Sequence, residues 1–85
     1  MALTVLYFAL LRESIGLNQE VIAWNATLDS VDALQNLLRA RGTLWQAALS
    51  PQQGVRVAVN QDLAQGHTDL KDGDEVAFFP PVTGG

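Results

Sequence analysis

Apolar residues follow two different spacings along this chain, and each spacing predicts its own kind of element. Leu3 to Leu10 is a near-continuous apolar run, which is typical of a central strand covered on both faces. The segment "DSVDALQNLLRARG" instead repeats apolar residues at the helical interval, with Asp29 or Ser30 as its N-cap and Gly42 after its end. The predicted apolar stripe of this helix consists of Val31, Leu34, Leu37 and Leu38.

Shorter elements fill the rest of the chain. "RESIGLNQ" predicts a turn that leads to a second strand at 20–24, and "LWQAALS" predicts one short helical segment that ends at Pro51. Further strands are expected at 55–59, 63–64 and 75–80. The first and last strands are the most apolar, so we expect both at the centre of the sheet, paired in parallel through the helix crossover. A mixed sheet with one main helix on one face is an α+β fold.

Composition places the chain among small globular domains. Its 85 residues, 48% hydrophobic and 16% charged, suit one domain with a thin core. The net charge of −4, with only five Lys and Arg residues, argues against nucleic acid and anionic membranes as partners. The apolar start "MALTVLYFALL" has no basic residue before it and is too short to span a bilayer, so it predicts a strand.

Side-chain chemistry is scarce. The absence of cysteine excludes disulfides, thiolate catalysis and Cys-ligated metals, and a lone His67 in a predicted loop is typical of a surface histidine. The glycines fit neither a dinucleotide-binding motif nor a P-loop. Four carboxylates around a predicted turn are interpreted as an acidic surface patch: Asp69, Asp72, Asp74 and Glu75. No side-chain active site is predicted.

The last nine residues, "AFFPPVTGG", leave one more reactive group, the carboxylate of Gly85. Pro80 and Pro81 favour an extended path that leads the tail away from the sheet. Gly84 and Gly85 form the narrowest possible peptide, around which another protein can close without meeting a Cβ. Once activated, for instance as an acyl-adenylate, such a carboxylate can be attacked by a nucleophile. The alternative is a merely flexible end, but the rigid Pro-Pro before it favours a function.

Three segments of the chain resemble the small subunit of molybdopterin synthase: "VLYFALLRE", "VAVNQ" and "DGDEVAFFPPVTGG". The resemblance covers nearly the whole chain, and the "FFPPVTGG" ending is its most specific part. It implies a ubiquitin-like β-grasp domain at 1–81, a flexible tail at 82–85 and a cytoplasmic sulfur carrier. It also implies that the chain itself binds no cofactor and no metal.

The resemblance further implies two protein partners. An adenylating enzyme similar to ubiquitin-activating enzymes would use ATP to convert Gly85 to an acyl-adenylate, and sulfur from a cysteine-desulfurase relay would then give a thiocarboxylate. The large synthase subunit, expected to hold the catalytic residues, would take in the tail formed by Pro81, Val82, Thr83, Gly84 and Gly85. There the sulfur would pass to a cyclic pyranopterin precursor, and two transfers would complete the dithiolene. The active synthase would be a heterotetramer with two of each subunit.

The residues themselves agree with this at two points. A chain without cysteine cannot carry sulfur as a persulfide, which leaves the C-terminus as the natural place. Strand alternation also leaves apolar side chains to spare, because Val76 and Phe78 facing the helix would turn Ala77 and Phe79 outward. The same alternation turns Val5 and Tyr7 inward, and Leu6 and Phe8 outward. The resemblance implies that partners bind at Phe8, Leu63 and Phe79, although Phe8 could instead be plain core.

Other functions share the same tail. Carriers for thiamine synthesis or tRNA thiolation have the fold and the Gly-Gly end, and the "FFPPVTGG" string favours the molybdopterin branch over them. A ubiquitin-like modifier, joined to lysines through an isopeptide bond, would use the same chemistry up to the adenylate. A pure binding module with an incidental tail is the third class of function.

Overall fold

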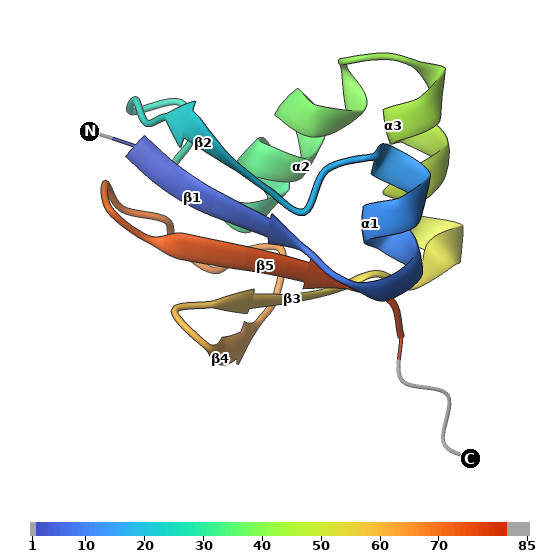
Figure 1. The fold of residues 1–85 in the computed structure, drawn as a ribbon. Coiled ribbons are helices and arrows are strands. Elements are labelled where there is room, and N and C mark those ends of the chain that lie inside the picture. The colour runs from blue at the N-terminus through green and yellow to red at the C-terminus, as the bar shows by residue number, and fades with distance from the viewer. Residues whose placement is uncertain (1, 82–85) are drawn as a thin grey trace.

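A computed structural model describes residues 2–81 and shows a five-stranded mixed sheet with helices packed on one of its faces (Figure 1). The elements, in chain order, are β1 (Ala2–Tyr7), α1 (Ala9–Ile15), β2 (Gln19–Ala23), α2 (Val31–Arg39), α3 (Thr43–Ala48), a 3₁₀ turn (Pro51–Gln53), β3 (Arg56–Val59), β4 (Asp62–Ala64) and β5 (Glu75–Phe79). The strands lie in the order β2-β1-β5-β3-β4. The predicted α+β class is confirmed.

The first and last strands pair in parallel at the centre of the sheet, as the sequence predicted. Their register runs from Thr4 opposite Glu75 to Tyr7 opposite Phe78. The other three pairs, β1 with β2, β3 with β4 and β3 with β5, are antiparallel. The parallel pair brings the carboxyl ends of β1 and β5 to the same edge of the molecule, and Phe8 N–H donates to the Phe78 carbonyl at 3.1 Å.

The core lies between the helix-facing side of the sheet and α2. Alternate residues of β1 and β5 are fully buried there, as predicted from period-2 alternation. Burial of side chains of this size contributes roughly 1.5–3 kcal/mol each to folding. The buried set from these elements is Leu3, Val5, Tyr7, Val31, Leu34, Leu38, Val76 and Phe78. The predicted stripe was wrong at Leu37, which lies off the sheet-facing side of α2 and is 42% exposed.

A helix, α1, replaces the predicted end of the first strand and most of the predicted turn after it. β1 ends at Tyr7, and Ala9 then adopts a φ of 56°, a left-handed conformation that breaks the extended run. Leu11 and Ile15, four residues apart, are the buried positions of α1, and Gly16 closes it in the left-handed conformation. The apolar run therefore contains two elements, which an apolar count alone does not separate.

The other helix boundaries differ in smaller ways. α2 begins as predicted, with Ser30 as the N-cap whose Oγ accepts from Ala33 N–H at 3.2 Å. It ends on Ala40 in a right-handed conformation, so Gly42 is not its left-handed C-terminal residue. Gly42 instead precedes α3 with a φ of 146°, a conformation that L side chains rarely adopt.

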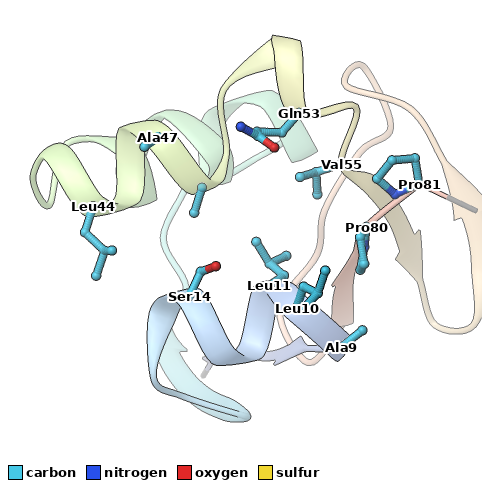
Figure 2. Close-up of a pocket in the computed structure, with 11 residues that line it drawn as sticks. Ala9, Leu10, Leu11, Ser14, Leu44, Ala47, Gln53, Val55, Pro80 and Pro81 are labelled. Carbon is cyan, nitrogen blue, oxygen red and sulfur yellow. The ribbon is translucent and has the colours of Figure 1, made fainter.

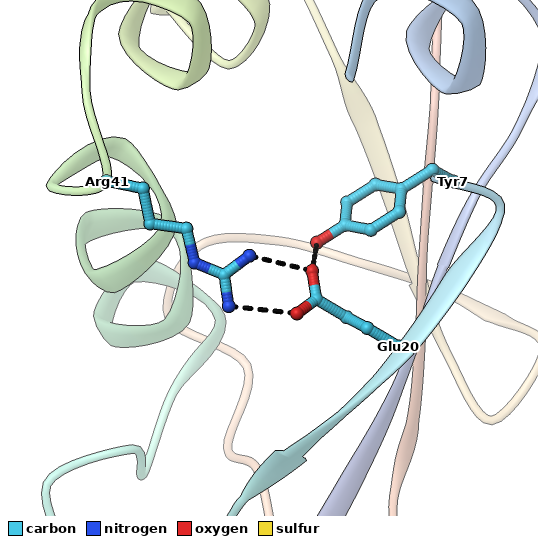
Figure 3. A network of polar contacts seen from close by, with 3 residues as sticks. All are labelled: Tyr7, Glu20 and Arg41. Carbon is cyan, nitrogen blue, oxygen red and sulfur yellow. Dashed lines mark hydrogen bonds and ion pairs between the residues drawn. The ribbon is translucent and has the colours of Figure 1, made fainter. Parts of the chain in front are cut away.

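A polar network ties the end of β1 to the segment between α2 and α3 (Figure 3). The Tyr7 hydroxyl donates to Glu20 at 2.6 Å, and the two terminal nitrogens of Arg41 donate to the same carboxylate at 2.8 and 2.9 Å. The Arg41 guanidinium carbon also lies 4.6 Å from the centre of the Trp45 ring, which in turn packs edge-on against Tyr7. The two partners of the half-buried Glu20 carboxylate, Tyr7 and Arg41, therefore come from different segments of the fold.

The network changes the acid–base properties of its members. Burial, and then the hydrogen bond to Glu20, raise the pKa of the Tyr7 phenol far above its usual value. Burial acts to raise the pKa of Glu20 as well, but the hydrogen bonds from Arg41 and Tyr7 and the Arg41 charge outweigh it. The pKa of Glu20 is therefore held below its usual range, and the pKa of Arg41 is raised by the same contact.

We expect Glu20→Gln to lower the free energy of unfolding at pH 7 by about 1 kcal/mol, because the neutral amide loses the charge-assisted part of the network. The pKa of Glu20 is lower in the folded than in the unfolded chain, so its stabilisation is complete above the unfolded value. It is lost as the pH falls through the folded value. Urea titrations at pH 7 and at successively lower pH should show the wild-type advantage shrinking. The exposed Glu13→Gln is the control, and equal stability of Glu20→Gln and wild type at pH 7 would contradict the assignment.

Candidate functional site

The candidate site begins where β5 ends. Pro80 and Pro81 follow Phe79 directly, and Pro81 lies against the loop after the 3₁₀ turn, since a Cβ on Gly54 would stand 3.7 Å from its Cγ. The root of the tail therefore runs close to Gly54. The predicted tail residues Val82, Thr83, Gly84 and Gly85, and with them the predicted flexible segment 82–85, lie outside the described residues.

One apolar surface lies on the sheet face opposite the helices, and we call it the open face. The strand register aligns four apolar residues across it: Leu6 opposite Ala77, Ala77 opposite Ala58, and Ala58 opposite Leu63. Leu63 is 68% exposed. A continuous apolar row across four strands is a surface that a monomer gains nothing by exposing to water.

Phe8 and Phe79 extend the open face toward the tail root. Phe79 pairs with Arg56 on β3, while its buried neighbour Phe78 pairs with Tyr7. Phe8 follows Tyr7 in an extended conformation (φ −119°, ψ 154°), which continues the strand alternation and places it in the row of Phe79. Phe8 is 45% exposed, and Phe79 is partly buried. The predicted outward orientation of both is confirmed, whereas their role in partner binding, like that of Leu63, stays a prediction.

The acidic residues near β5 serve the local backbone. Asp74 accepts from the Lys71 N–H at 2.8 Å and from the Asn60 side-chain amide at 2.9 Å. Glu75 in turn donates its backbone N–H to the Asn60 side chain at 3.0 Å. Asp69 and Asp72 are exposed, as a surface patch requires. The patch is thus partly a turn-closing motif, which its sequence signal alone did not reveal.

Within residues 2–81, no group of three or more His, Asp or Glu side chains is placed to hold a metal ion. Over the same part of the chain, none of the helices is long and apolar enough to cross a membrane. His67 is exposed, in keeping with its prediction as a surface residue.

A second apolar surface lies on the other side of the tail root (Figure 2). It is a groove of about 610 Å³ between α1 and α3, and we call it the α1–α3 groove. Its lining consists of Ala9, Leu10, Leu11, Ser14, Leu44, Ala47, Ala48, Gln53, Val55, Pro80 and Pro81. Sequence reasoning missed it because α1 was not predicted. The apolar spacing of Leu11 and Ile15 was the available signal.

Comparison with known proteins shows where this geometry belongs. The model of the ThiS family matches residues 5–85, which is nearly the whole chain. The chain belongs to the ThiS family. It is 44% identical over 81 residues to the molybdopterin synthase sulfur carrier subunit of Escherichia coli (strain K12), covering 95% of this chain and 96% of that one. The subunit of the same name from Haemophilus influenzae is 41% identical and covers 98% of this chain and 99% of its own length.

Solved structures agree with this ThiS family fold. A putative molybdopterin converting factor subunit 1 from Pyrococcus furiosus superposes with a TM-score of 0.77 at 28% identity, over 96% of this chain and 99% of that one. Subunits 1 and 2 of molybdopterin-converting factor from Helicobacter pylori 26695 have been solved as a complex, in which the matching chain has a TM-score of 0.64 and 26% identity over the full length of both. The SAMP1 protein of Haloferax volcanii, 23% identical over the full length of both chains with a TM-score of 0.75, shares the fold. The predicted ubiquitin-like β-grasp fold is confirmed.

The two phenylalanines of β5 test which side of this strand faces the core and which side lies on the open face. Phe78→Arg should destabilise the domain by more than about 3 kcal/mol, because it removes a fully buried ring and buries an unpaired charge. Phe79→Arg should melt within a few degrees of wild type, because its side chain lies on the open face. Thermal melting followed by circular dichroism measures both. Comparable loss in the two variants would show that the open face is part of the core.

Proposed function

We propose that this chain is the sulfur carrier subunit of molybdopterin synthase and that it carries sulfur at the carboxylate of Gly85. The observation that supports this most strongly is the near-full-length similarity, at 41–44% identity, to two proteins of that name. The geometry of the described residues agrees with it, because β5 ends on a stiff Pro80-Pro81 step at the border of two apolar surfaces.

The chemistry proceeds through activation of a poor electrophile. A carboxylate oxygen of Gly85 attacks the α-phosphate of ATP in an adenylating partner, and pyrophosphate leaves. A persulfide sulfur from a cysteine-desulfurase relay then attacks the acyl carbon and displaces AMP, which gives an acyl disulfide. A thiol of the relay cleaves the S–S bond of this acyl disulfide and is itself oxidised to a disulfide, which leaves a thiocarboxylate, or 1-thioglycine, at the end of the chain. The chain holds neither ATP nor a metal of its own in this scheme.

The tail, now carrying sulfur as a thiocarboxylate, then enters the large synthase subunit, where this sulfur passes to a cyclic pyranopterin precursor. Two transfers complete the molybdopterin dithiolene, in a cytoplasmic assembly with two of each subunit. The catalytic side chains belong to the large subunit, and this chain supplies the sulfur and the narrow tail that carries it. Pro81 to Gly85 is the inserted segment, and Gly84 and Gly85 keep it narrow because neither has a Cβ.

A ubiquitin-like protein modifier is the second candidate, because it would share the fold and the adenylated terminus. The likeness to SAMP1, at 23% identity, bears on the fold alone. The carrier function is favoured by the relatives named as sulfur carrier subunits, which are 41–44% identical to this chain. It also agrees with the lack of cysteine, because a carrier without cysteine must hold sulfur elsewhere, as at a C-terminal carboxylate.

Deleting Gly85, or adding one residue after it, should abolish sulfur transfer and leave the melting temperature unchanged. The reacting atom is the terminal acyl carbon, and a displacement of about one ångström at a reacting centre can cost a hundredfold in rate. The measurement is molybdopterin formation by the reconstituted synthase. Molybdopterin formation by the extended chain, with its extra residue still present by mass spectrometry, would refute the carrier mechanism.

Phe79→Arg should weaken binding to both the large synthase subunit and the adenylating enzyme. Both must grip the surface next to the tail root, and a central aromatic anchor can contribute roughly 2 kcal/mol or more to such an interface. Calorimetric titration of each partner with the folded variant measures the loss. Wild-type affinity for both partners would remove Phe79 from the interface.

A further inference from the structure

The α1–α3 groove is a surface that the open face does not account for. Its two walls are helices, and Figure 2 shows Leu44 pointing from α3 toward α1, with Leu10, Leu11 and Ser14 pointing toward α3. Leu10 is 69% exposed and Leu44 is 52% exposed. Both of these large apolar side chains line the α1–α3 groove, so a sizeable apolar part of the groove is in contact with water.

The wall formed by α3 carries no charge. Residues 42–55, from the residue before α3 to the residue before β3, include no Asp, Glu, Lys or Arg, although the chain has 14 of these (five Lys and Arg plus nine Asp and Glu). A helix exposed only to solvent normally carries charged residues on its outer face. Depletion of charge around an apolar centre is instead the composition of the core of a protein–protein interface.

The groove and the open face share a border at the tail root. Phe8 belongs to the open face, and the next two residues, Ala9 and Leu10, line the groove. On β5 the same change occurs between Phe79 and Pro80. A protein that draws the tail into an active site has to bring its surface up to Pro80 and Pro81, and it then reaches the groove as well.

We propose that the α1–α3 groove receives an apolar side chain of the subunit that accepts the tail, so that this subunit holds the tail root from both sides. The proposal rests on the proposed function and adds a second contact surface to it. Its occupant is a neutral, apolar projection, because the groove offers no charged side chain and only Ser14 and Gln53 as polar side chains.

A small molecule fits the groove less well. The volume of about 610 Å³ is within the range of ligand pockets, roughly 300–1,000 Å³. A nucleotide or a phosphorylated pterin, however, would need cationic or several polar groups for its phosphate, and the lining supplies neither. The apolar, uncharged lining therefore favours a protein side chain.

The test is a calorimetric titration of the large synthase subunit of the same organism with the full-length chain and its variants. Leu44→Arg should raise the Kd at least tenfold, because it places an unpaired charge in a desolvated contact. Leu37→Arg, the same change at an exposed leucine of α2 outside the groove, should change the Kd less than twofold. Leu10→Arg, on the opposite wall, repeats the test if Leu44→Arg melts early.

The outcomes separate the two proposals. Failure of the wild-type chain to bind the large subunit would overturn the proposed function and this inference together. Wild-type binding with unchanged affinity of both groove variants would overturn the inference alone, as would a loss confined to the adenylating enzyme.

Other occupants have their own signatures, and each of them would overturn the inference. Self-association of the chain that Leu44→Arg abolishes would mean that a second copy fills the groove. Shifts of the Leu10 and Leu44 methyl resonances when the chain is shortened to end at Pro81, without any partner, would mean that residues 82–85 fill it.

Discussion

The parallel pairing of β1 with β5 is the constraint on which the rest of the structure depends. It joins the first and last strands of the fold at the centre of the sheet, so that both are covered by helices on one face and exposed on the other. Because parallel strands end at the same edge, the exit of β1 into α1 lies beside the exit of β5 into Pro80 and Pro81 (Figure 1). The open face, the α1–α3 groove and the tail root all meet there as a consequence.

Aromatic packing and one partly buried ion pair hold that edge in place. Tyr7, the last residue of β1, stacks on Phe78 with ring centres 6.1 Å apart and donates to Glu20, which Arg41 also binds. A rigid base of this kind matters because the proposed reacting group, the Gly85 carboxylate, lies only a few residues further along the chain. Each degree of freedom lost at the root reduces the entropy that a partner must remove when it takes in the tail.

Much of the fold could be predicted from the sequence because its signals are local. The alternation in β5 separates Phe78 from Phe79, and the capped helix at Val31–Arg39 has its own spacing and its own N-cap. α1 could not be read in the same way, because its apolar residues continue those of β1 without a polar break. The break is the left-handed backbone conformation of Ala9, after which α1 packs against α3 and β5.

The features of the candidate site also differ in whether the sequence alone could predict them. The carboxylate of Gly85 was predicted from its chemistry and stays a prediction. The outward residues of the strands follow from period-2 alternation, which needs no knowledge of distant contacts. The α1–α3 groove could not be predicted from the sequence, because it exists only once α1 and α3 lie side by side next to Pro80 and Pro81. Likewise, the hydrogen bond that Asp74 accepts from Asn60 joins residues 14 positions apart, so it could not be predicted from local sequence.

The most direct test of the sulfur-carrier account is the intact mass of the chain purified from cells with and without the sulfur-relay enzyme. We predict two species from cells with the relay, which differ by the mass difference between sulfur and oxygen, with the difference mapping to Gly85. From cells without the relay we predict the carboxylate species alone. A chain that never gains this mass, or that is recovered as conjugates with other proteins, would contradict the account.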